Sequence, residues 1–389
     1  MITAQFNDSF APITDGVANG VRNYAYWLNR KYGKAYVVTP EFPGYEDKDE
    51  FEVIRYTSIP YLARKPYRLG LHNISFEARE RLRNIPLDII HARSPFSSGA
   101  FARQIAKGKN IPLVASFHSQ YYYDIKEQIP SETITRGLLA LIADFYMKAD
   151  AVWTVSNKTA ETLRSYGYVG DISVINNGTD MIMPDNYEEV RKKTGKELGI
   201  KDNEFVFCYV GQLVWHKNLK LIAHGLSELR RKGRRFKMVI VGAGDAENEF
   251  EHMLLSLGLE DNVIMTGQVR DREKLMGIYA RADLFLFPSI YDTFGIVVRE
   301  AAALKCPCVL IEGSNAAESV RHGINGYLCR NEVDSFTSRL AEVMDDRKTL
   351  EKVSEEAMKT LPEGWESIVD RAFSMYQDVI RGFKSGKSN

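Results

Sequence analysis

The stretch from Phe205 to Gly233, FVFCYVGQLVWHKNLKLIAHGLSELRRKG, contains the repeating unit of the fold. It begins with a short apolar run, as in a buried strand, and ends with apolar residues at helical spacing. The loop between them carries Lys217 directly ahead of the helix. A cation there acts with the positive end of the helix dipole on the same anion, so we predict a diphosphate clamp. The alternative is a solvated surface lysine, with His216 an ordinary loop histidine.

Strand and helix patterns alternate along most of the 389 residues, which is typical of α/β proteins with parallel sheets. A chain of this length exceeds one ordinary core and predicts two domains. The polar segment 180–204 suits a connection between two sheets, so we expect the domain boundary near residues 180–200. The predicted strands are ITAQF, AYVVTP, LDIIHA, PLVASFH, AVWTVS and ISVIN in the first half, and FVFCYVG, KMVIVGAG, VIMTGQ, LFLFPS and PCVLI in the second.

The charge balance of the chain is even, with 51 Lys and Arg residues against 51 Asp and Glu residues. This argues against nucleic acid or a strongly acidic substrate as the partner. The opening residues lack the pattern of a secretory signal, and the apolar run 137–143 stops at Asp144, well short of a membrane span, so we expect a cytoplasmic protein. The cysteines lack C-x-x-C spacing and are expected to be buried reduced thiols; they are Cys208, Cys306, Cys308 and Cys329.

A second stretch, Ser289 to Glu300 or SIYDTFGIVVRE, follows the predicted strand LFLFPS and holds two acids. On one continuous helix, residues eight apart diverge by roughly 80° around the axis and do not face the same point. We therefore place Asp292 in a loop and start the helix near Phe294 to Gly295, with Glu300 about a turn and a half further along. Asp292 would then bind a sugar hydroxyl, and Glu300 both hydroxyls of a ribose. In the alternative interpretation Asp292 caps the helix and Glu300 is a solvated helical acid.

Further candidates lie at predicted strand ends, where parallel sheets bind ligands. The run Phe10 to Gly20, FAPITDGVANG, is a small-residue turn leading into a helix, and Gly16 would let a phosphate approach its backbone. A plain strand-to-helix turn is the alternative. His118 closes the strand PLVASF and Arg93 ends LDIIHAR, so both could face a ligand. A buried, hydrogen-bonded core histidine explains His118 nearly as well.

Two motif matches are set aside. Asp47-Lys-Asp49 has the D-x-D spacing of a metal–nucleotide site, but it lies in the polar run YEDKDE and follows no buried strand, so we interpret it as solvated. Gly242-Ala-Gly244 after MVIV resembles a dinucleotide fingerprint, but Glu247 stands where the third glycine belongs. We interpret this second run as a turn.

Taken together, these segments resemble the retaining glycosyltransferases of group 1, also called family four. The resemblance runs over nearly the whole chain, through DGV, SFHS, VINNGTD, VGQLVWHKN, IVGAG, TGQV, FPSIYDTFGIVVREAAA, GSNAAESVRHGINGYL and GWESIVDRAFSMYQ. It implies the GT-B fold, with two Rossmann-like domains facing across a cleft and a C-terminal helix that crosses back to the first domain. The implied domains are 1–182 with the helix at about 366–389, for the acceptor, and 183–365, for the nucleotide sugar.

The resemblance also implies roles for single residues. Gly16 and Lys217 would meet the donor diphosphate, and Val269 would read the base through its backbone. The implied donor-binding residues are Gly16, Gln212, Lys217, Val269, Asp292, Phe294, Gly295, Ile296 and Glu300. The implied catalytic residues are Lys217, His118 and Asp292, and those on the acceptor side are Asp15, Arg93 and His118. We expect no cofactor and no metal, because lysine and amide groups supply the positive field.

Two positions depart from the family pattern. Gln212 stands where the family has an arginine after the glycine of G-R-L, so a charge-assisted contact to the diphosphate becomes a neutral one. Asp292 stands where the family has the first glutamate of a pair separated by seven residues, and its side chain is one methylene shorter. The first change predicts weaker donor binding unless another cation compensates, and the second leaves the transferred sugar open.

The implied reaction transfers a hexose from a nucleotide diphosphate sugar, with UDP-sugars expected, to a hydroxyl of a lipid or glycan acceptor with retention of configuration. The segment 61–83 mixes cations with aromatic residues and would rest on anionic lipid, which suits a lipid acceptor and a peripheral position on the inner face of the cell membrane. A solvated surface is the alternative. The acids that oppose it are Glu77 and Glu80, and its later cations are Arg79, Arg81 and Arg83.

Three other functions fit parts of the sequence. A glycoside hydrolase would use Asp292 and Glu300 as its two carboxylates and would release sugar without any nucleotide. A non-catalytic sugar-nucleotide binding protein, suggested by Gln212 and Asp292, would bind nucleotide without turnover. A nucleotide-sugar epimerase on a related two-domain fold would change the sugar with no acceptor present.

Overall fold

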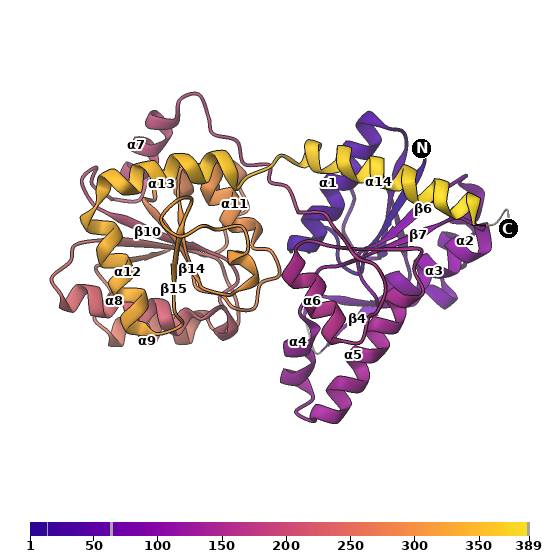
Figure 1. Cartoon of the computed structure of the whole chain (residues 1–389), viewed down its shortest axis with the longest axis horizontal. Coiled ribbons are helices and arrows are strands. Elements are labelled where there is room, and N and C mark those ends of the chain that lie inside the picture. The colour runs from indigo at the N-terminus through magenta and orange to yellow at the C-terminus, as the bar shows by residue number, and fades with distance from the viewer. Residues whose placement is uncertain (14, 63–64, 387–389) are drawn as a thin grey trace. The chain divides into compact units, whose positions relative to one another are not determined.

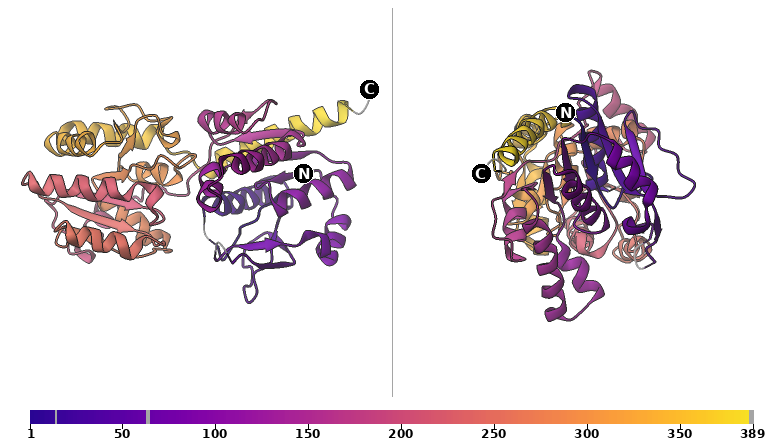
Figure 2. Two further views of the ribbon diagram at one scale, coloured as in Figure 1. Left: turned by 90° about the horizontal axis from the view of Figure 1, so that it is seen from below. Right: turned by 90° about the vertical axis from the view of Figure 1, so that its right-hand side faces the viewer.

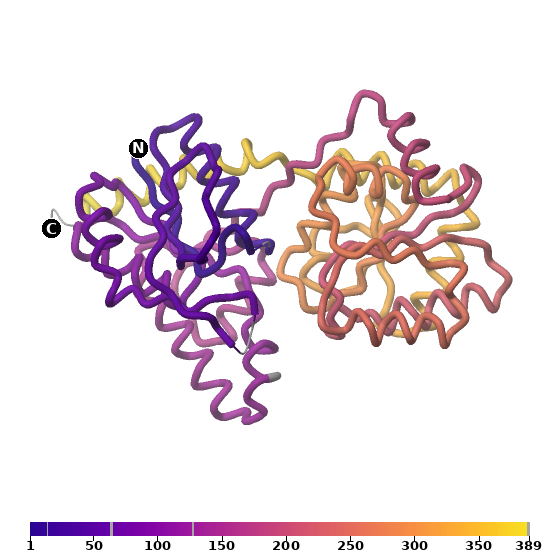
Figure 3. The backbone as a smooth tube through the Cα atoms, turned by 180° about the vertical axis from the view of Figure 1, so that it is seen from behind, coloured from indigo at the N-terminus to yellow at the C-terminus, as the bar shows by residue number. Residues whose placement is uncertain are grey.

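The computed structural model describes residues 1–13, 15–62 and 65–386. The chain divides into two compact units, Met1–Gly178 with Trp365–Asn389, and Thr179–Gly364 (Figure 1). The boundaries expected from the sequence lie slightly later, at 182/183 and 365/366. Figure 3 follows the two crossings of the chain between the units. They are hydrogen-bonded to each other, because the Thr179 amide donates to the Glu363 carbonyl at 2.8 Å.

The first unit contains a seven-stranded parallel sheet in the order β3-β2-β1-β6-β7-β8-β9. Every residue of β1, β2, β6 and β7 is buried, as expected for strands covered on both faces. The strands are β1 (Thr3–Phe6), β2 (Ala35–Pro40), β3 (Glu52–Tyr56), β6 (Ile89–Ala92), β7 (Leu113–Phe117), β8 (Ala151–Thr154) and β9 (Ser173–Val174), with an antiparallel pair β4 (Ser58–Pro60) and β5 (Arg68–Gly70).

Helices complete the hydrophobic core of the first unit. Helices α1 and α14 share one hydrophobic cluster with the sheet, and α2 and α3 share another. Helices α4 and α5 pack together as a hairpin (Figure 1). The helices are α1 (Gly16–Lys31), α2 (Phe76–Asn84), α3 (Ser97–Lys109), α4 (Tyr121–Gln128), α5 (Glu132–Met147), α6 (Asn157–Ser165) and α14 (Trp365–Ser385), with the 3-10 turn η1 (His72–Ile74).

The C-terminal helix α14 is an integral part of the first unit, and Figure 2 gives two further views of it, in yellow. Its Tyr376 stacks on Trp153 of β8 with ring centroids 5.0 Å apart, and its hydroxyl is hydrogen-bonded to His91 of β6. At its start, Trp365 packs so closely on Gly178 that a Cβ there would lie 2.7 Å from the Trp365 Cα. The predicted return of the last helix to the first domain is confirmed.

The second unit contains a six-stranded parallel sheet in the order β12-β11-β10-β13-β14-β15. Helix α8 contacts α9 and α12, whereas α10 contacts α7 and α11, and α11 contacts α13. The strands are β10 (Val206–Val210), β11 (Lys237–Val241), β12 (Val263–Met265), β13 (Leu284–Phe287), β14 (Cys308–Ile311) and β15 (Tyr327–Cys329). The helices are α7 (Tyr187–Glu197), α8 (Leu219–Arg231), α9 (Glu247–Ser256), α10 (Arg272–Arg281), α11 (Ile296–Ala303), α12 (Val333–Asp345) and α13 (Arg347–Thr360), with the 3-10 turns η2 (Trp215–Lys217) and η3 (Asn315–Ala317).

Four of the described strands are absent from the sequence-based prediction: the edge strands β3 and β15, and the short antiparallel pair β4 and β5. Strand β3 reads EVIRY, and its Glu52 and Arg55 interrupt the apolar run because an edge strand keeps one side near solvent. Strand β15 is only three residues long, too short for a periodic pattern. The prediction for the cysteines is confirmed, since all four are buried and free.

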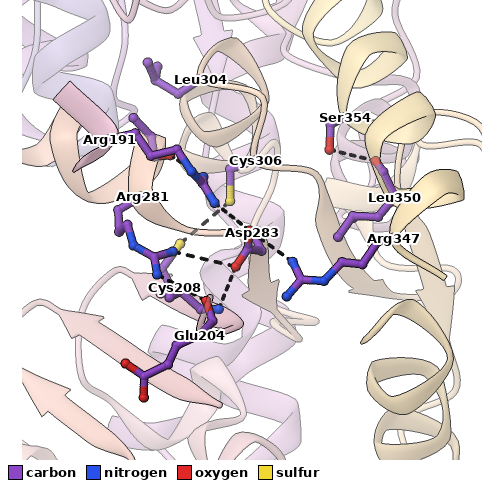
Figure 4. Close-up of polar contacts among 12 residues, drawn as sticks. Arg191, Glu204, Cys208, Arg281, Asp283, Leu304, Cys306, Arg347, Leu350 and Ser354 are labelled. Atoms are coloured by element: carbon purple, nitrogen blue, oxygen red, sulfur yellow. Dashed lines mark hydrogen bonds and ion pairs between the residues drawn. The ribbon is translucent and has the colours of Figure 1, made fainter. Parts of the chain in front are cut away.

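A carboxylate in the second unit joins several elements of its core (Figure 4). Asp283 lies directly before β13. Its carboxylate forms ion pairs with Arg191 of α7 at 2.7 Å and with Arg347 of α13 at 3.3 Å. It also accepts the Val206 amide at 2.8 Å, and Arg281 lies 3.7 Å away. The Asp283 side chain is only 9% exposed, so its charge is balanced by these arginines and not by water.

Replacing Asp283 with asparagine is expected to destabilise the second unit by about 3 kcal/mol, because it leaves the buried Arg281 and the partly buried Arg191 without their counter-charge. Chemical denaturation followed by the amide hydrogen exchange of peptides from β10 and β13 measures the loss in this unit. The matched control is Asp345→Asn, which breaks an exposed pair with Arg234 and should cost no more than about 1 kcal/mol. Equal stability losses in the two variants would contradict the structural role of Asp283.

Candidate functional site

The strands β10 and β13 are neighbours in the second sheet, and the loops that follow them lie together at the carboxyl ends of its strands. The loop after β10 ends in the turn η2 with Lys217, and the loop after β13 carries Asp292. Lys217 Nζ donates to Asp292 Oδ1 at 2.6 Å, and lies 5.5 Å from the centre of the Tyr291 ring. The Lys217 side chain is 12% exposed. The alternative of a solvated surface lysine is therefore wrong, whereas His216 is exposed and lies against Tyr291.

The two carboxylate oxygens of Asp292 differ in their hydrogen bonding. Oδ2 is buried and has no hydrogen-bond partner among the described residues. A buried carboxylate oxygen without a donor is costly, so a ligand hydroxyl would stabilise it. Asp292 is not the cap of α11, because the residue at that position is Gly295.

The segment from Asp292 to Ile296 is fixed by a hydrogen bond from the helix that follows it. Gly295 adopts a left-handed conformation with φ of 69°, which favours glycine, and α11 begins at the next residue. The predicted helix start near Phe294 to Gly295 is thus confirmed to within a residue or two. Arg299 of α11 is buried; it donates to the Phe294 carbonyl at 2.6 Å and lies 4.0 Å from the centre of the Phe294 ring. Burial lowers the pKa of Arg299 to about 10.

Glu300 lies on the same helix but in a separate environment. It is 4% exposed, so the alternative of a solvated helical acid is wrong. Arg272 donates to its Oε1 at 2.9 Å and Tyr279 to its Oε2 at 3.1 Å. Burial raises the pKa of Glu300, and the charge of Arg272 opposes that rise. The two acids 292 and 300 therefore have different partners on different elements.

Three backbone loops pack side by side at this edge of the sheet. The Gly211 amide donates to the Val241 carbonyl at 3.0 Å, and the Gly242 amide donates to the Gly267 carbonyl at 2.9 Å. Gly242 has φ of 147°, and a Cβ there would lie 1.8 Å from the Gly211 carbonyl oxygen. The run 242–244 is accordingly a loop that supports residues 211–213. Two predicted donor-binding residues lie on these loops, the exposed Gln212 and the half-buried Val269.

The first unit holds the remaining predicted residues. Asp15 caps α1, since its Oδ1 accepts the Ala18 amide at 2.8 Å, and its Oδ2 accepts the Tyr67 hydroxyl at 3.2 Å. Gly16 is exposed as the first residue of α1. The predicted small-residue turn thus leads into the helix as expected, and the phosphate contact remains a prediction.

Arg93 and His118 lie together at the ends of β6 and β7. Arg93 is 3% and His118 8% exposed, and Arg93 Nη1 lies 3.4 Å from His118 Nε2. The Arg93 guanidinium stacks on the Tyr24 ring at 3.7 Å and donates to Gln5 at 3.4 Å. Burial, together with the charge of Arg93, holds the pKa of His118 well below its ordinary value. The imidazole is therefore neutral near pH 7.

The set-aside aspartates differ from the prediction. Asp47 accepts two hydrogen bonds from Arg55, at 2.7 and 2.8 Å. Asp49 accepts a hydrogen bond from Arg22 at 2.7 Å. They are ion-paired and not simply solvated, because the arginines lie within reach on β3 and α1. Among the described residues, no cluster of His, Cys, Asp or Glu side chains is arranged to hold a metal ion. No helix within the described ranges has the length and apolar character to cross a membrane.

Several residues of this site were not predicted from the sequence. Arg272 and Tyr279 are seven apart on α10, so they lie on the same side of the helix and both reach Glu300. Asp180, in the motif VINNGTD, is the second acid that Arg272 contacts. Arg299 interrupts the apolar pattern IVVREAAA, and a charge on the buried face of a helix is a signal that could have identified it.

Comparison with known proteins agrees with this architecture. The profile described as "Glycosyl transferases group 1" matches residues 190–360, and that of "Glycosyltransferase Family 4" matches residues 14–181. The chain is 26% identical to an alpha-monoglucosyldiacylglycerol synthase of Streptococcus pneumoniae, over 78% of this chain and 69% of that protein. It is 25% identical to the enzyme of the same name from Acholeplasma laidlawii, over 96% of each.

Among solved structures, Anabaena HepE in complex with UDP-glucose superposes with a TM-score of 0.76 at 18% identity, covering 97% of this chain and 100% of that one. This likeness confirms the predicted GT-B fold. The two family profiles lie end to end along the chain, one on each unit. The chain therefore belongs to the group 1, family 4 glycosyltransferases.

Proposed function

We propose that this glycosyltransferase transfers a hexose, with retention of configuration, from a nucleotide diphosphate sugar to a hydroxyl of a lipid or glycan acceptor. The observation that carries the proposal is the state of Asp292. Its Oδ1 is bound by Lys217 at 2.6 Å, while its buried Oδ2 has no partner among the described residues. This arrangement offers a cation to a diphosphate and an acceptor oxygen to a sugar hydroxyl at one point.

In the proposed reaction, negative charge grows on the leaving diphosphate as the glycosidic bond breaks through an oxocarbenium-like state. Lys217 and the amides near Gly16 and Phe294 to Ile296 would stabilise this charge, each donor contributing about 3 kcal/mol in comparable sites. The acceptor hydroxyl would give its proton to the departing phosphate. His118, neutral and buried, would then help to position the sugar, so no general base is required. We further propose that the reaction needs no metal, because these donors supply the positive field.

Gln212 weakens this positive field. Its side chain is exposed and neutral, in the loop where the family has an arginine. The cationic contact to the diphosphate from the C-terminal unit is therefore assigned to Lys217.

A UDP-sugar is the proposed donor, since HepE was solved with UDP-glucose on the same fold. A panel of UDP-, GDP- and ADP-sugars scored by thermal shift tests this, because a ligand that binds only the folded state stabilises it more, the further its concentration exceeds its Kd. A clear rise in melting temperature with UDP-sugars supports the proposal. No rise with any member of the panel would contradict it.

A lipid acceptor is proposed on the names of the two synthases. In the segment 61–83 that would approach a membrane, three arginines already have partners within the protein. Within it, residues 63–64 lie outside the described residues, Arg68 donates to Ser58, and Arg79 donates to backbone carbonyls. Arg81 pairs with Glu52 at 2.6 Å. Flotation with anionic vesicles tests the attachment, and a protein that stays at the bottom of the gradient would rule it out.

Replacing Glu300 with glutamine should weaken binding of UDP by about 10-fold or more, because the variant loses a carboxylate that accepts both ribose hydroxyls. Isothermal titration measures the affinity. The matched control is Glu273→Gln on the exposed side of α10, which should bind as the unaltered chain does. Equal affinity of both variants for UDP would show that Glu300 does not hold the ribose.

Other functions are separated by their products. A non-catalytic binding protein, which the neutral Gln212 favours, would bind UDP-sugars and release no UDP with any acceptor. An epimerase would convert the sugar without acceptor, and a hydrolase would release it from a glycoside without nucleotide. Transfer to an added acceptor with release of UDP identifies the proposed reaction.

A further inference from the structure

The carboxylate of Glu300 lies in a cluster of side chains from helix α10 and from the start of the second unit. Arg272 Nη2 donates to Oε1 at 2.9 Å, and the Tyr279 hydroxyl donates to Oε2 at 3.1 Å. The two donors are seven residues apart and hence lie on one side of α10. Each oxygen of this carboxylate therefore has a protein donor that fixes its direction.

Arg272 serves a second acid. The same Nη2 nitrogen also donates to Asp180, which follows Thr179 where the chain enters the second unit. The two acids differ in burial, since the Glu300 side chain is 5% exposed and that of Asp180 is 43% exposed. The pair with Glu300 is thus the less screened of the two. Asp180 therefore competes with Glu300 for the Arg272 guanidinium.

These neighbours set the protonation of Glu300. Burial raises its pKa, Arg272 lowers it, the negative charge of Asp180 raises it, and the hydrogen bond from Tyr279 lowers it. Cys208 of β10 is the remaining titratable group beside Tyr279. An ionised carboxylate accepts two hydroxyls, whereas the protonated form turns one oxygen into a donor. Binding of a ribose through both hydroxyls therefore depends on the ionised form.

We propose that Arg272 is a positioning residue that keeps Glu300 ionised and oriented to accept the donor ribose, and that Asp180 limits this effect by sharing the guanidinium. The inference rests on the proposed function, because it presupposes that Glu300 binds the ribose. It adds that Asp180, close to the start of the second unit, lowers the affinity for the donor. Arg272 itself need not touch the reacting atoms.

The test is the pH dependence of UDP and GDP binding, measured by titration calorimetry from about pH 5.5 to about pH 8.5. The ionised form binds, so affinity falls as the pH drops through the pKa of Glu300. Arg272→Met removes an influence that lowers this pKa, so the midpoint moves to higher pH. We expect Arg272→Met to bind about 10-fold more weakly than the unaltered chain on the acid side of its midpoint, and to recover as the pH rises above it. Asp180→Asn removes an influence that raises the pKa, so its midpoint moves to lower pH.

The control is Glu300→Gln, which has no group to titrate at this position. It reports the contribution of the nucleotide itself, whose terminal phosphate titrates near pH 6. Opposite midpoint shifts in Arg272→Met and Asp180→Asn support the inference, because general damage to the fold would not move them in opposite directions.

Two results overturn it. If Arg272→Met loses the same factor at every pH, or if neither midpoint moves while Glu300→Gln still weakens binding, Arg272 does not control the ionisation of Glu300 and the proposed function stands alone. If the unaltered chain binds neither nucleotide, the proposed function fails and takes the inference with it.

Discussion

Lys217→Met will lower the turnover of sugar transfer by about 10²- to 10³-fold, the usual cost of removing one preorganised charge from a transition state. The structure supports a large effect because Lys217 is held in place by Asp292 at 2.6 Å and its neighbouring loop residue Gln212 is neutral. Initial rates at saturating donor measure the change. The melting temperature of the variant should fall far less than its turnover.

Lys220→Met provides a matched control, since Lys220 lies three residues further on and is exposed against the Trp215 ring. It should retain turnover within about twofold, because an exposed charge is screened by water. Full turnover in Lys217→Met, in a protein that is folded, would remove the diphosphate role from this residue.

The second large effect concerns folding. A chain that ends at Gly364 should lose the folded state of the first unit and keep that of the second. Helix α14 supplies buried apolar surface to the first unit, including Trp365 and Tyr376, and each such aromatic contributes about 3–5 kcal/mol when truncated alone. Together they amount to about 6–10 kcal/mol, comparable to the whole stability of an ordinary domain, about 5–15 kcal/mol. The second unit has a separate core and needs no residue of α14.

Amide hydrogen exchange read by mass spectrometry follows both units in one sample. In the shortened chain, peptides from β6, β7 and β8 should exchange rapidly while those from β10 and β13 stay protected. A chain that ends at Ser385 is the control and should match the full chain. Protected peptides from β6 to β8 after removal of α14 would show that the helix is not part of this core.

Much of the fold could be predicted because its signals are local. The buried strands of both sheets read as short apolar runs, and the loops after them carry small or charged residues at fixed places. The positions of Lys217, Asp292 and Glu300 on loop, loop and helix follow from such patterns. The edge strand β3 was missed because solvent on one side allows Glu52 and Arg55 there.

The pairings within the site could not be predicted, since they join segments far apart in the chain. Lys217 and Asp292 are 75 residues apart, and nothing in either motif says that they form an ion pair. Arg272 and Glu300 are 28 residues apart on helices whose contact depends on the order of strands in the sheet. The burial of Glu300 likewise follows from packing, because its sequence position fits an exposed acid equally well.

The most direct test of the account is a crystal structure of the chain with UDP bound. We expect a phosphate oxygen within about 3 Å of Lys217 Nζ and both ribose hydroxyls donating to Glu300. UDP bound at another part of the chain, with Lys217 still paired to Asp292 and Glu300 untouched, would contradict the account.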